Sequence, residues 1–396
     1  MIGRREIRDS ASRVSLTPHV VEKDYVLGWM LAGISAHTAL RDSWVFKGGT
    51  CLKKCFFETY RFSEDLDFTL QDGSHLDDHF LTQTFSEIGE WIYEHSGIEF
   101  PSHLQTFDIY TNPRGRVSCQ GKVSYRGPVA PRDLPRIKLD LTADERLVRT
   151  PQRVSVFHPY SDAPETGIDV LAYAYEELFG EKVRALAERT RPRDLYDVVN
   201  LFRNVDALPS ASALSEVLRQ KCEFKGINVP VLADLERHRV ELEGLWQNML
   251  AHQLPTLPPY KSFWDELPAF FDWLGGGSAP ASLAAYVGGA GELVLRRRDL
   301  HLLVSNQTQS VIEIIRFAAG NRLLVELTYG DSRRLIEPYS LRQTQAGNIV
   351  LHAWNTDKNE HRSYRVDRMQ NARVTQRTFI PRYAVELSPQ SPASFG

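Results

Sequence analysis

The sequence predicts a mixed α/β fold in its first part, followed by helices and then by a small β-rich domain. Residues 44–70 combine a short apolar strand, a glycine turn and a strand in which acidic and apolar residues alternate. Residues 206–274 carry apolar residues at helical spacing, among them Leu218, Trp246 and Phe263. After a glycine-rich break, short alternating segments recur at the spacing typical of a small barrel or sandwich.

The composition is that of a soluble globular protein with more than one domain. The chain has 396 residues, of which 42% are hydrophobic and 24% are charged, and its net charge is −3. Because this charge is small, a polyanionic partner would need a local basic patch. The four cysteines form no disulfide framework, and no apolar run has the length of a membrane span. We therefore expect a cytoplasmic protein with no membrane partner.

A glycine turn near the start of the chain has the features of a phosphate-binding loop. Lys47 precedes Gly48 and Gly49, which allow a sharp turn and a close approach of backbone N–H groups to phosphate. Thr50 is expected to begin a helix, whose N-terminus would favour an anion at the same place. This turn is not a P-loop, because the pattern G-x-x-x-x-G-K-[ST] is absent.

A pair of aspartates follows on the next predicted strand. Asp65 and Asp67 alternate with Leu66 and Phe68, so both carboxylates project from one face. Two carboxylates side by side repel each other unless a cation lies between them. Mg²⁺, which binds one or two carboxylates together with substrate phosphate oxygens, is the natural occupant. The alternative, a glycine hairpin beside solvated acids, leaves the ordered combination unexplained.

The chain resembles the AbiEii/AbiGii-type nucleotidyltransferase toxins of the DNA polymerase β-like superfamily through Lys47-Gly48-Gly49-Thr50-x-Leu52 followed by Arg61-Phe62-Ser63-x-Asp65-Leu66-Asp67-Phe68. The resemblance implies a polymerase β-like core in residues 1–205 and a helical extension in 206–274. It also implies that Asp65 and Asp67 hold Mg²⁺ or Mn²⁺. An NTP substrate would contact the turn from Lys47 to Thr50, and Ser63.

A third carboxylate is expected on a neighbouring strand, as in other members of the superfamily. Residues 137–141 alternate, with Asp140 on the polar face, which makes Asp140 the candidate. A two-metal site needs such a further oxygen ligand for its second ion. The alternative is a surface aspartate paired with Lys138.

A lysine lies on the apolar face of the helix predicted for residues 175–189. Lys182 shares a row with Leu178 and Leu186, and burying an unpaired ammonium group is costly. Lys182 therefore either extends its ammonium group to solvent or meets an anion, and a triphosphate beside the aspartates would be that anion. The resemblance places Lys182, together with Glu177, in the active-site set of the family.

The next predicted helix opens with Arg191-Pro192-Arg193-Asp194-Leu195-Tyr196-Asp197, which resembles the last motif of the family. In that motif one aspartate acts with the lysine. The spacing does not decide between Asp194, which is the first choice, and Asp197. An aspartate in a first turn is also a simple partner of the helix dipole.

Two charged segments have both a structural and a functional interpretation. Glu22-Lys23-Asp24 lies on a helix predicted to begin at Thr17-Pro18, and we expect a solvated charged face there, although the family carries a similar segment. Residues 112–138 are strongly basic, and a solvated edge and contact with a triphosphate or RNA are equally good interpretations. The basic residues of this segment are Arg114, Arg116, Lys122, Arg126, Arg132, Arg136 and Lys138.

The C-terminal segment, residues 293–396, follows a linker at 275–292 and resembles a WYL domain, a small SH3-like barrel. The resemblance depends on Ile336-Glu337-Pro338-Tyr339, on Leu351-x-Ala353-Trp354 and on Arg362-x-Tyr364-Arg365-x-Asp367-Arg368-Met369, although the tripeptide that names the domain is not intact. It implies a nucleotide or nucleic-acid ligand. Candidates for an anion pocket are Arg334, Arg342, Arg365 and Arg368, with a salt-bridged surface as the alternative.

Together these resemblances imply a toxin or defence effector that transfers a nucleoside monophosphate from an NTP to a hydroxyl group. The expected acceptor is the 3′ end of tRNA, whose modification would block translation, and the expected protein partner is a cognate antitoxin. A small-molecule acceptor and a protein acceptor, including the chain itself, are alternatives. A ligand-sensing regulator with a vestigial transferase core is another, against which the intact Asp65, Asp67 and Lys182 argue.

Overall fold

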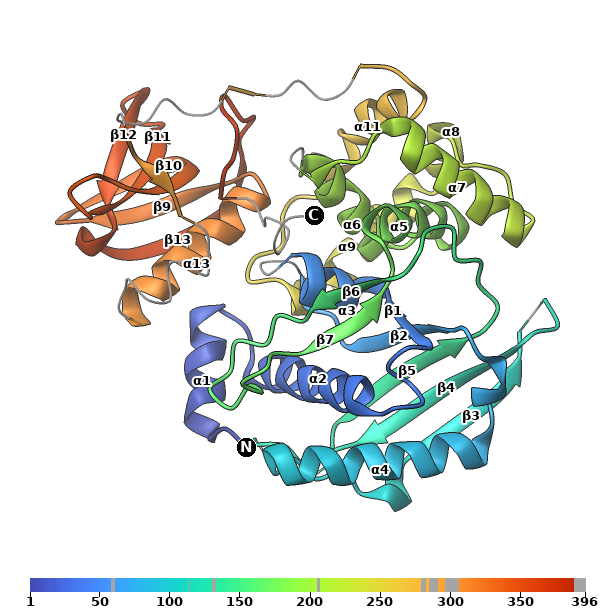
Figure 1. Cartoon of the computed structure of the whole chain (residues 1–396). Helices are drawn as coiled ribbons and strands as arrows, with labels where there is room; N and C mark the ends of the chain where they lie inside the picture. Colours follow the sequence, from blue (N-terminus) through green and yellow to red (C-terminus); the bar gives the residue numbers. More distant parts are fainter. Residues whose placement is uncertain are drawn as a thin grey trace.

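The computed structural model describes residues 1–57, 61–112, 114–129, 133–204, 207–278, 283–284, 291–295 and 306–387. It contains a mixed sheet with helices on one face, a group of helices beside this sheet, and a separate antiparallel sheet near the C-terminus (Figure 1). Most of the predicted linker, residues 275–292, and Arg132 of the basic segment lie outside the described residues. No helix in the described ranges is both long enough and apolar enough to cross a membrane.

The mixed sheet has seven strands in the order β3-β4-β5-β2-β1-β7-β6. These strands are β1 (Trp44–Lys47), β2 (Asp65–Leu70), β3 (Thr106–Thr111), β4 (Val117–Ser124), β5 (Arg136–Thr142), β6 (Gln152–Ser155) and β7 (Asp169–Ala172). β2 runs parallel to β5 and β1 runs parallel to β7, whereas the other neighbours are antiparallel. The alternation predicted for β2 and β5 is confirmed, because Leu66, Phe68, Leu139 and Leu141 are buried.

One face of this sheet is covered by helices. α1 (Arg4–Arg13) packs on α2 (Pro18–Ala36), which in turn contacts α4 (Asp78–Ser96) and β7. α2 begins at Pro18, as its proline predicts, and α4 ends at Gly97, whose φ of 74° is left-handed. The aspartates of β2 project from the opposite face, because side chains alternate along a strand.

The solvated face predicted for Glu22-Lys23-Asp24 is wrong. Glu22 and Asp24 are only 1% and 5% exposed. Glu22 accepts a hydrogen bond from the backbone N–H of Val129, and Asp24 accepts one from Lys54 Nζ at 2.8 Å. The charges are buried because α2 is surrounded by other elements, and each charged group meets a partner from one of them.

The second group of helices packs beside the sheet. It comprises α5 (Tyr175–Arg189), α6 (Pro192–Arg203), α7 (Ala211–Lys225), α8 (Leu232–Glu236), α9 (Arg239–Leu250), α10 (Lys261–Trp264) and α11 (Leu267–Leu274). α5 contacts both α6 and α7, and α6 contacts α9, so the core and the helical extension share one hydrophobic core. The extension therefore supports α5 and α6 directly.

The C-terminal part is an antiparallel sheet with one helix. Its elements are β8 (Leu293–Val294), α13 (Asn306–Gly320), β9 (Leu323–Tyr329), β10 (Ser332–Gln343), β11 (Ile349–Asn355), β12 (Glu360–Arg365) and β13 (Met369–Thr378). The strand order is β12-β11-β10-β9-β13, with β8 also paired to β10. No pairing within the described residues joins β12 to β13, so the closed barrel stays a prediction.

This C-terminal part is joined to the first by buried polar contacts at the end of α13. The hydroxyl of Tyr196, on α6, donates a hydrogen bond to Asn321 Oδ1 at 3.0 Å. Glu266 accepts hydrogen bonds from Arg203, also on α6, and from Arg322, beside Asn321. α13 also contacts α1. The two parts of the chain therefore meet on α6 and on α1.

The substitution Tyr196→Phe tests this joint. We expect it to lower the free energy of unfolding by about 1–2 kcal/mol, because it removes the hydrogen-bond donor to a buried amide oxygen. Urea denaturation would measure the change. The matched control is Tyr93→Phe, since Tyr93 is 59% exposed and its hydroxyl can bond to water. A loss no larger than that of the control would contradict a contribution of the Tyr196–Asn321 contact to stability.

Candidate active site

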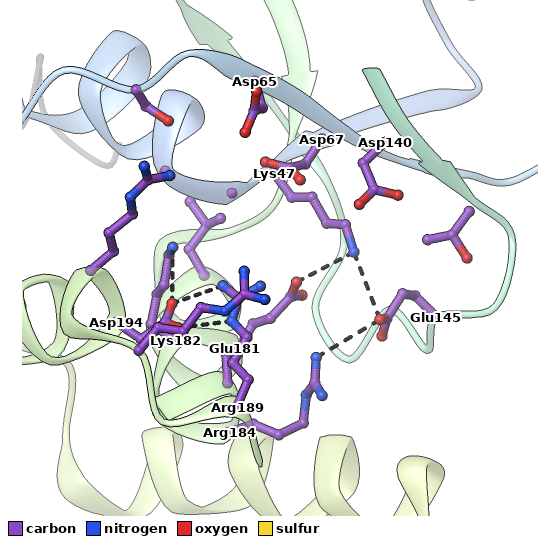
Figure 2. A pocket seen from close by; sticks show the side chains of 18 of the residues that line it. Lys47, Asp65, Asp67, Asp140, Glu145, Glu181, Lys182, Arg184, Arg189 and Asp194 are labelled. Carbon is purple, nitrogen blue, oxygen red and sulfur yellow. Dashed lines mark hydrogen bonds and ion pairs between the residues drawn. The ribbon is translucent and has the colours of Figure 1, made fainter. Parts of the chain in front are cut away.

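A polar cavity of about 390 Å³ lies between the uncovered face of the mixed sheet and the helices α5 and α6. Figure 2 shows carboxylates on its upper wall, from β2 and β5, and mostly basic side chains, together with Glu181 and Asp194, on its lower wall, from the helices. Of the residues predicted from the sequence, those lining the cavity are Lys47, Gly48, Gly49, Ser63, Asp65, Asp67, Asp140, Lys182 and Asp194.

The three predicted metal ligands come together on adjacent strands. Asp67 and Asp140 are register partners across the parallel pair β2 and β5, and Asp65 is two residues away on the same face. Burial, and next the charge of Asp140, raise the pKa of Asp67 to about 6. Burial also raises the pKa of Asp140, and the charge of Asp65 adds to this effect. These carboxylates therefore favour added positive charge.

The carboxylate oxygens of this trio are the donors that Mg²⁺ and Mn²⁺ prefer, so the residues fit such an ion. In the described part of the chain, no three His, Cys, Asp or Glu side chains are gathered closely enough to form a complete metal site. The metal role of Asp65, Asp67 and Asp140 therefore stays a prediction.

The glycine turn lies so close to these acids that side chains cannot be accommodated. Gly48 has a φ of +83°, and a Cβ atom there would lie 2.0 Å from Asp67 Oδ2. A Cβ atom on Gly49 would lie 2.7 Å from Arg61 Nη2. The two glycines are thus needed because the backbone passes directly beneath the side chains of the cavity.

The helix expected to begin at Thr50 is different in the structure. α3 (Gly48–Cys51) begins two residues earlier, is four residues long, and continues as a π-helical turn over Leu52–Phe56. Such a short helix contributes little dipole to an anion site. Thr50 is buried, and its hydroxyl donates to the backbone carbonyl of Asp65. It therefore fastens the turn to β2 and is not among the residues lining the cavity.

Lys47 crosses the cavity between two groups of acids. Its Nζ lies 3.3 Å from Glu181 and 3.7 Å from Glu145, as the dashed lines in Figure 2 mark. Burial lowers the pKa of Lys47, but Glu181, Glu145 and Asp67 outweigh burial and raise it overall. Lys47 is therefore a permanently charged group beside the aspartates of the sheet.

Lys182 is held by the aspartates of α6. Its Nζ lies 2.7 Å from Asp197 and 3.7 Å from Asp194. Asp197 also accepts two hydrogen bonds from Arg61, both at 2.7 Å, whereas Asp194 accepts two from Arg189. Of the two aspartates that the sequence left open, Asp197 is thus the closer partner of Lys182, and Asp194 is the one that lines the cavity.

Glu177, which the family resemblance grouped with Lys182, lies outside the cavity lining. It is fully buried and accepts hydrogen bonds from the backbone N–H groups of Val148 and Arg149. Lys221 Nζ lies 2.7 Å from it. Glu177 therefore anchors the loop after β5 to α5 and α7.

Three arginines at the junction of α5 and α6 line the cavity, and the sequence analysis gave them no role of their own. Arg189 ends α5, Arg191 is the residue before α6, and Arg193 lies in the first turn of α6. Between them Thr190 takes a left-handed φ of 47°, which breaks the helix, and all three arginines line the cavity. Within the described residues, Arg191 and Arg193 have no carboxylate at ion-pair distance. The signal in the sequence was the alternating run Arg-x-Arg-x-Arg.

Comparison with known families decides the assignment. The family model described as "Nucleotidyl transferase AbiEii toxin, Type IV TA system" matches residues 29–275, which is more than half of the chain. The chain belongs to the AbiEii nucleotidyltransferase toxin family. The match contains the glycine turn, all three carboxylates of the sheet, and the helices α5 and α6. A second model, of the WYL domain, matches residues 310–374, from within α13 to within β13.

Among solved structures, the AbiEii-family chain is similar to the nucleotidyltransferase toxin MenT4 from Mycobacterium tuberculosis, with 19% identity over 70% of this chain and 91% of MenT4, and a TM-score of 0.49. It also matches the proteasome accessory factor PafBC of Arthrobacter aurescens, with 12% identity over 95% of this chain and 74% of that one, and a TM-score of 0.18. No match was found among curated proteins.

The substitution Asp197→Asn tests the buried charges around Lys182. We expect a loss of about 3–5 kcal/mol in the free energy of unfolding at pH 7, because Arg61 and Lys182 would stay buried without their shared carboxylate. Chemical denaturation would measure it. The control Asp265→Asn removes an exposed partner of Lys261 and should change stability little. Equal effects of both substitutions would contradict the assigned importance of Asp197.

The stability difference between the wild type and Asp197→Asn should depend on pH. Burial opposes the charge of Asp197, but Arg61 and Lys182 outweigh burial and lower its pKa in the folded protein. The stabilisation is therefore complete above the unfolded pKa of about 3.9 and is lost as the pH falls through the folded value. The stability difference between the wild type and Asp197→Asn should be constant from about pH 5 to 8 and should shrink below about pH 4.

Proposed function

We propose that this AbiEii-family protein transfers a nucleoside monophosphate from an NTP to a hydroxyl group of RNA, with the 3′ end of tRNA as the acceptor and a block of translation as the result. One observation carries the proposal. Three neighbouring carboxylates on a sheet and a group of cations on α5 and α6 line opposite walls of one cavity. This division of charge suits a metal-bound triphosphate, which is anionic along its length.

The cationic wall supplies the binding site for the triphosphate. Lys182 and Arg189 are held in place by Asp197 and Asp194, whereas Arg191 and Arg193 have no such carboxylate partner in the described part of the chain. Cations without an ion pair are available to phosphate oxygens, and the planar guanidinium group binds them through two hydrogen bonds. The backbone of Gly48 and Gly49 approaches from the side of the sheet.

Asp65, Asp67 and Asp140 would hold Mg²⁺ or Mn²⁺. A bound ion supplies Lewis-acid activation of the acceptor hydroxyl and neutralises charge on the α-phosphate. The raised pKa of Asp67 and Asp140 supports this role, because closely spaced carboxylates gain most from a neighbouring cation.

In the proposed reaction, the acceptor oxygen forms a bond to the α-phosphorus as the bond from this phosphorus to the bridging oxygen breaks. Pyrophosphate leaves, and the hydroxyl proton passes to solvent. Lys182 and Arg189 are positioned to neutralise the negative charge that grows on the leaving pyrophosphate. Asp197 orients Lys182 through their ion pair.

An exposed basic row supports a nucleic-acid acceptor. Lys138 is the register partner of Asp65, and Lys122 is the register partner of Lys138, so all three share one face of the sheet. Lys122, Lys138 and Arg136 are exposed beside the catalytic acids. A phosphate backbone lying along this row would bring a hydroxyl end to the cavity.

Other basic residues of the same segment have structural partners. Arg126 donates a hydrogen bond to Glu99, and Arg114 stacks on Phe224, with its guanidinium carbon 4.4 Å from the ring centre. The basic segment therefore divides into residues that hold loops in place and the row formed by Lys122, Arg136 and Lys138.

Incubation of the purified protein with total bacterial RNA, Mg²⁺ and each α-labelled NTP in turn tests the proposed function. We expect label on tRNA, its loss with a chelator and its recovery with Mg²⁺ or Mn²⁺. Asp67→Asn and Lys182→Met should each lower the rate at least about 100-fold, the cost typical of removing a group that stabilises transition-state charge. Label found only on protein, or unchanged in these variants, would contradict the RNA-modifying function.

The double variant Lys122→Glu/Lys138→Glu tests the docking of the acceptor. RNA labelling should fall about tenfold or more and become less dependent on salt, because phosphate contacts release counterions. The KM for the NTP should not change, since neither lysine lines the cavity. Arg5→Glu/Arg8→Glu, at exposed positions on α1, alters the net charge equally and serves as the control. Unchanged RNA labelling would contradict the docking of the acceptor on Lys122 and Lys138.

A further inference from the structure

The cavity extends past the carboxylates onto the outer strands of the mixed sheet, where three neutral side chains line it. They are Tyr110 on β3, Ser118 on β4 and Thr142 on β5. Ser118 is the register partner of both Tyr110 and Thr142, so the three form one row across three strands, which we call the neutral row. None of these side chains has a role in the chemistry proposed for the phosphate groups.

The neutral row lies on one side of the acids, and the basic row lies on the other. Asp140 is placed on β5 between Lys138 and Thr142, two residues from each, and all three share one face of the sheet. An acceptor docked on Lys122 and Lys138 therefore approaches Asp140 from the side opposite to the neutral row. The phosphate groups face the cations of α5 and α6, so the base is the part of the NTP left for the neutral row.

The ring of Tyr110 is on the open face of the edge strand β3. Phe107 and Ile109, which lie on the other face, pack against the hydrophobic core, and the ring centre of Phe107 lies 5.2 Å from that of Phe85. Tyr110 is 37% exposed, and in the described part of the chain it has neither a hydrogen-bond partner nor a ring contact. Such a ring is free to stack with a flat ring of a ligand.

The two hydroxyl groups of the neutral row present one donor and one acceptor. The hydroxyl of Ser118 donates to Thr142 Oγ1 at 3.2 Å, and the backbone N–H of Asp144 donates to the same oxygen at 3.0 Å. Both lone pairs of Thr142 Oγ1 are thereby used, so its own O–H is left to donate. The oxygen of Ser118, whose hydrogen is directed to Thr142, is left to accept.

We propose that the neutral row binds the base of the NTP, with the base stacked on Tyr110 and one of its edges on the hydroxyl groups of Thr142 and Ser118. This inference rests on the proposed nucleotidyl transfer. A ribose separates the base from the α-phosphate, and β4 separates Tyr110 from the strand of Asp140. Neighbouring strands are about 4.8 Å apart, so β3 and β5 lie roughly 10 Å from each other. The base therefore reaches Tyr110 while the α-phosphate stays beside Asp140.

A fixed donor beside a fixed acceptor divides the four bases into two classes. Adenine and cytosine present an amino donor followed by a ring-nitrogen acceptor, whereas guanine and uracil present a carbonyl acceptor followed by a ring N–H donor. In one orientation of the stacked base, Thr142 and Ser118 match only one of these orders. Tyr110 thus supplies affinity for any base, and Thr142 supplies a preference for either the amino bases or the keto bases.

Calorimetry on the full-length protein with Mg²⁺ tests the base site without an acceptor. The ligands are the α,β-methylene analogues of ATP, GTP, CTP and UTP, and inorganic tripolyphosphate, which has no base. Tyr110→Ala should raise the Kd of the best-bound analogue about tenfold or more, the cost typical of losing one stacked base, and should leave the Kd of tripolyphosphate unchanged. Tyr110→Phe keeps the ring and should bind like the wild type. The matched control is Tyr93→Ala, at an exposed position on α4.

Thr142→Val tests the preference between the two classes of base. It keeps the shape of the side chain but removes the donor, so it should abolish most of the difference in Kd between amino and keto analogues, which one hydrogen bond sets at about fivefold or more. Thr142→Ser keeps the hydroxyl and should retain the difference. Equal Kd values of the four analogues for the wild type would overturn the role of Thr142 and Ser118.

The outcomes for the base site and for the proposed function are distinct. An unchanged Kd of the analogues in Tyr110→Ala, or binding of tripolyphosphate by the wild type as tight as that of every analogue, would overturn the base site and leave the transfer to RNA standing. Analogue binding that depends on Tyr110, together with no labelling of RNA, would support the base site and contradict the acceptor. Absence of binding by every ligand would overturn both.

Discussion

The crowding of like charges on one wall of a cavity is the constraint on which the rest of the structure depends. Asp65, Asp67 and Asp140 repel one another, and burial raises the pKa of Asp67 and Asp140, which makes ionisation of these two carboxyl groups less favourable. The opposite wall carries Lys182, which is paired with Asp197, and also Arg191 and Arg193, which have no carboxylate at ion-pair distance in the described part of the chain. A protein keeps such groups apart and unneutralised only at a stability cost, so their arrangement fits a site that becomes neutral when a metal-bound triphosphate enters.

The backbone is shaped around this constraint. Parallel pairing of β2 with β5 sets Asp67 directly beside Asp140. A shift of β2 by one residue would turn Asp67 into the core and away from Asp140. The glycine turn passes so close to Asp67 that a Cβ atom at Gly48 is excluded. Thr50 then joins the turn to the carbonyl of Asp65. The paired motif in the sequence is therefore one spatial unit, in which each part restricts the other.

The sequence could predict the features that follow from local periodicity. Alternation identified β2 and β5 with their aspartates, and a lysine on an apolar helix face identified Lys182. Predictions made from the sequence of a single helix failed where the packing of neighbouring elements decides whether a side chain is buried or which partner it has. The charges of Glu22 and Asp24 are buried because α2 is surrounded, and the choice between Asp194 and Asp197 depends on how α6 meets α5. Arg191 and Arg193 were named only as part of a motif. Their place in the cavity was not predicted, because the left-handed backbone of Thr190, which lies before them, leaves no periodic pattern in the sequence.

The two domains of the chain meet on the helix that completes the cavity. Tyr196 and Asp197 are adjacent on α6, and one bonds to Asn321 of the C-terminal part while the other bonds to Lys182 and Arg61. A shift of α6 that shortened the contact of Tyr196 would have to strain the contacts of Asp197, because both sets of hydrogen bonds are buried and directional. Adjacent contacts on one helix couple the cavity to the C-terminal sheet only under one condition. The helix α6 must have two arrangements, and the two sites must favour them to different extents. Any such coupling would be reciprocal, so occupancy of the cavity would alter the docking of the C-terminal sheet by the same factor that docking alters the cavity.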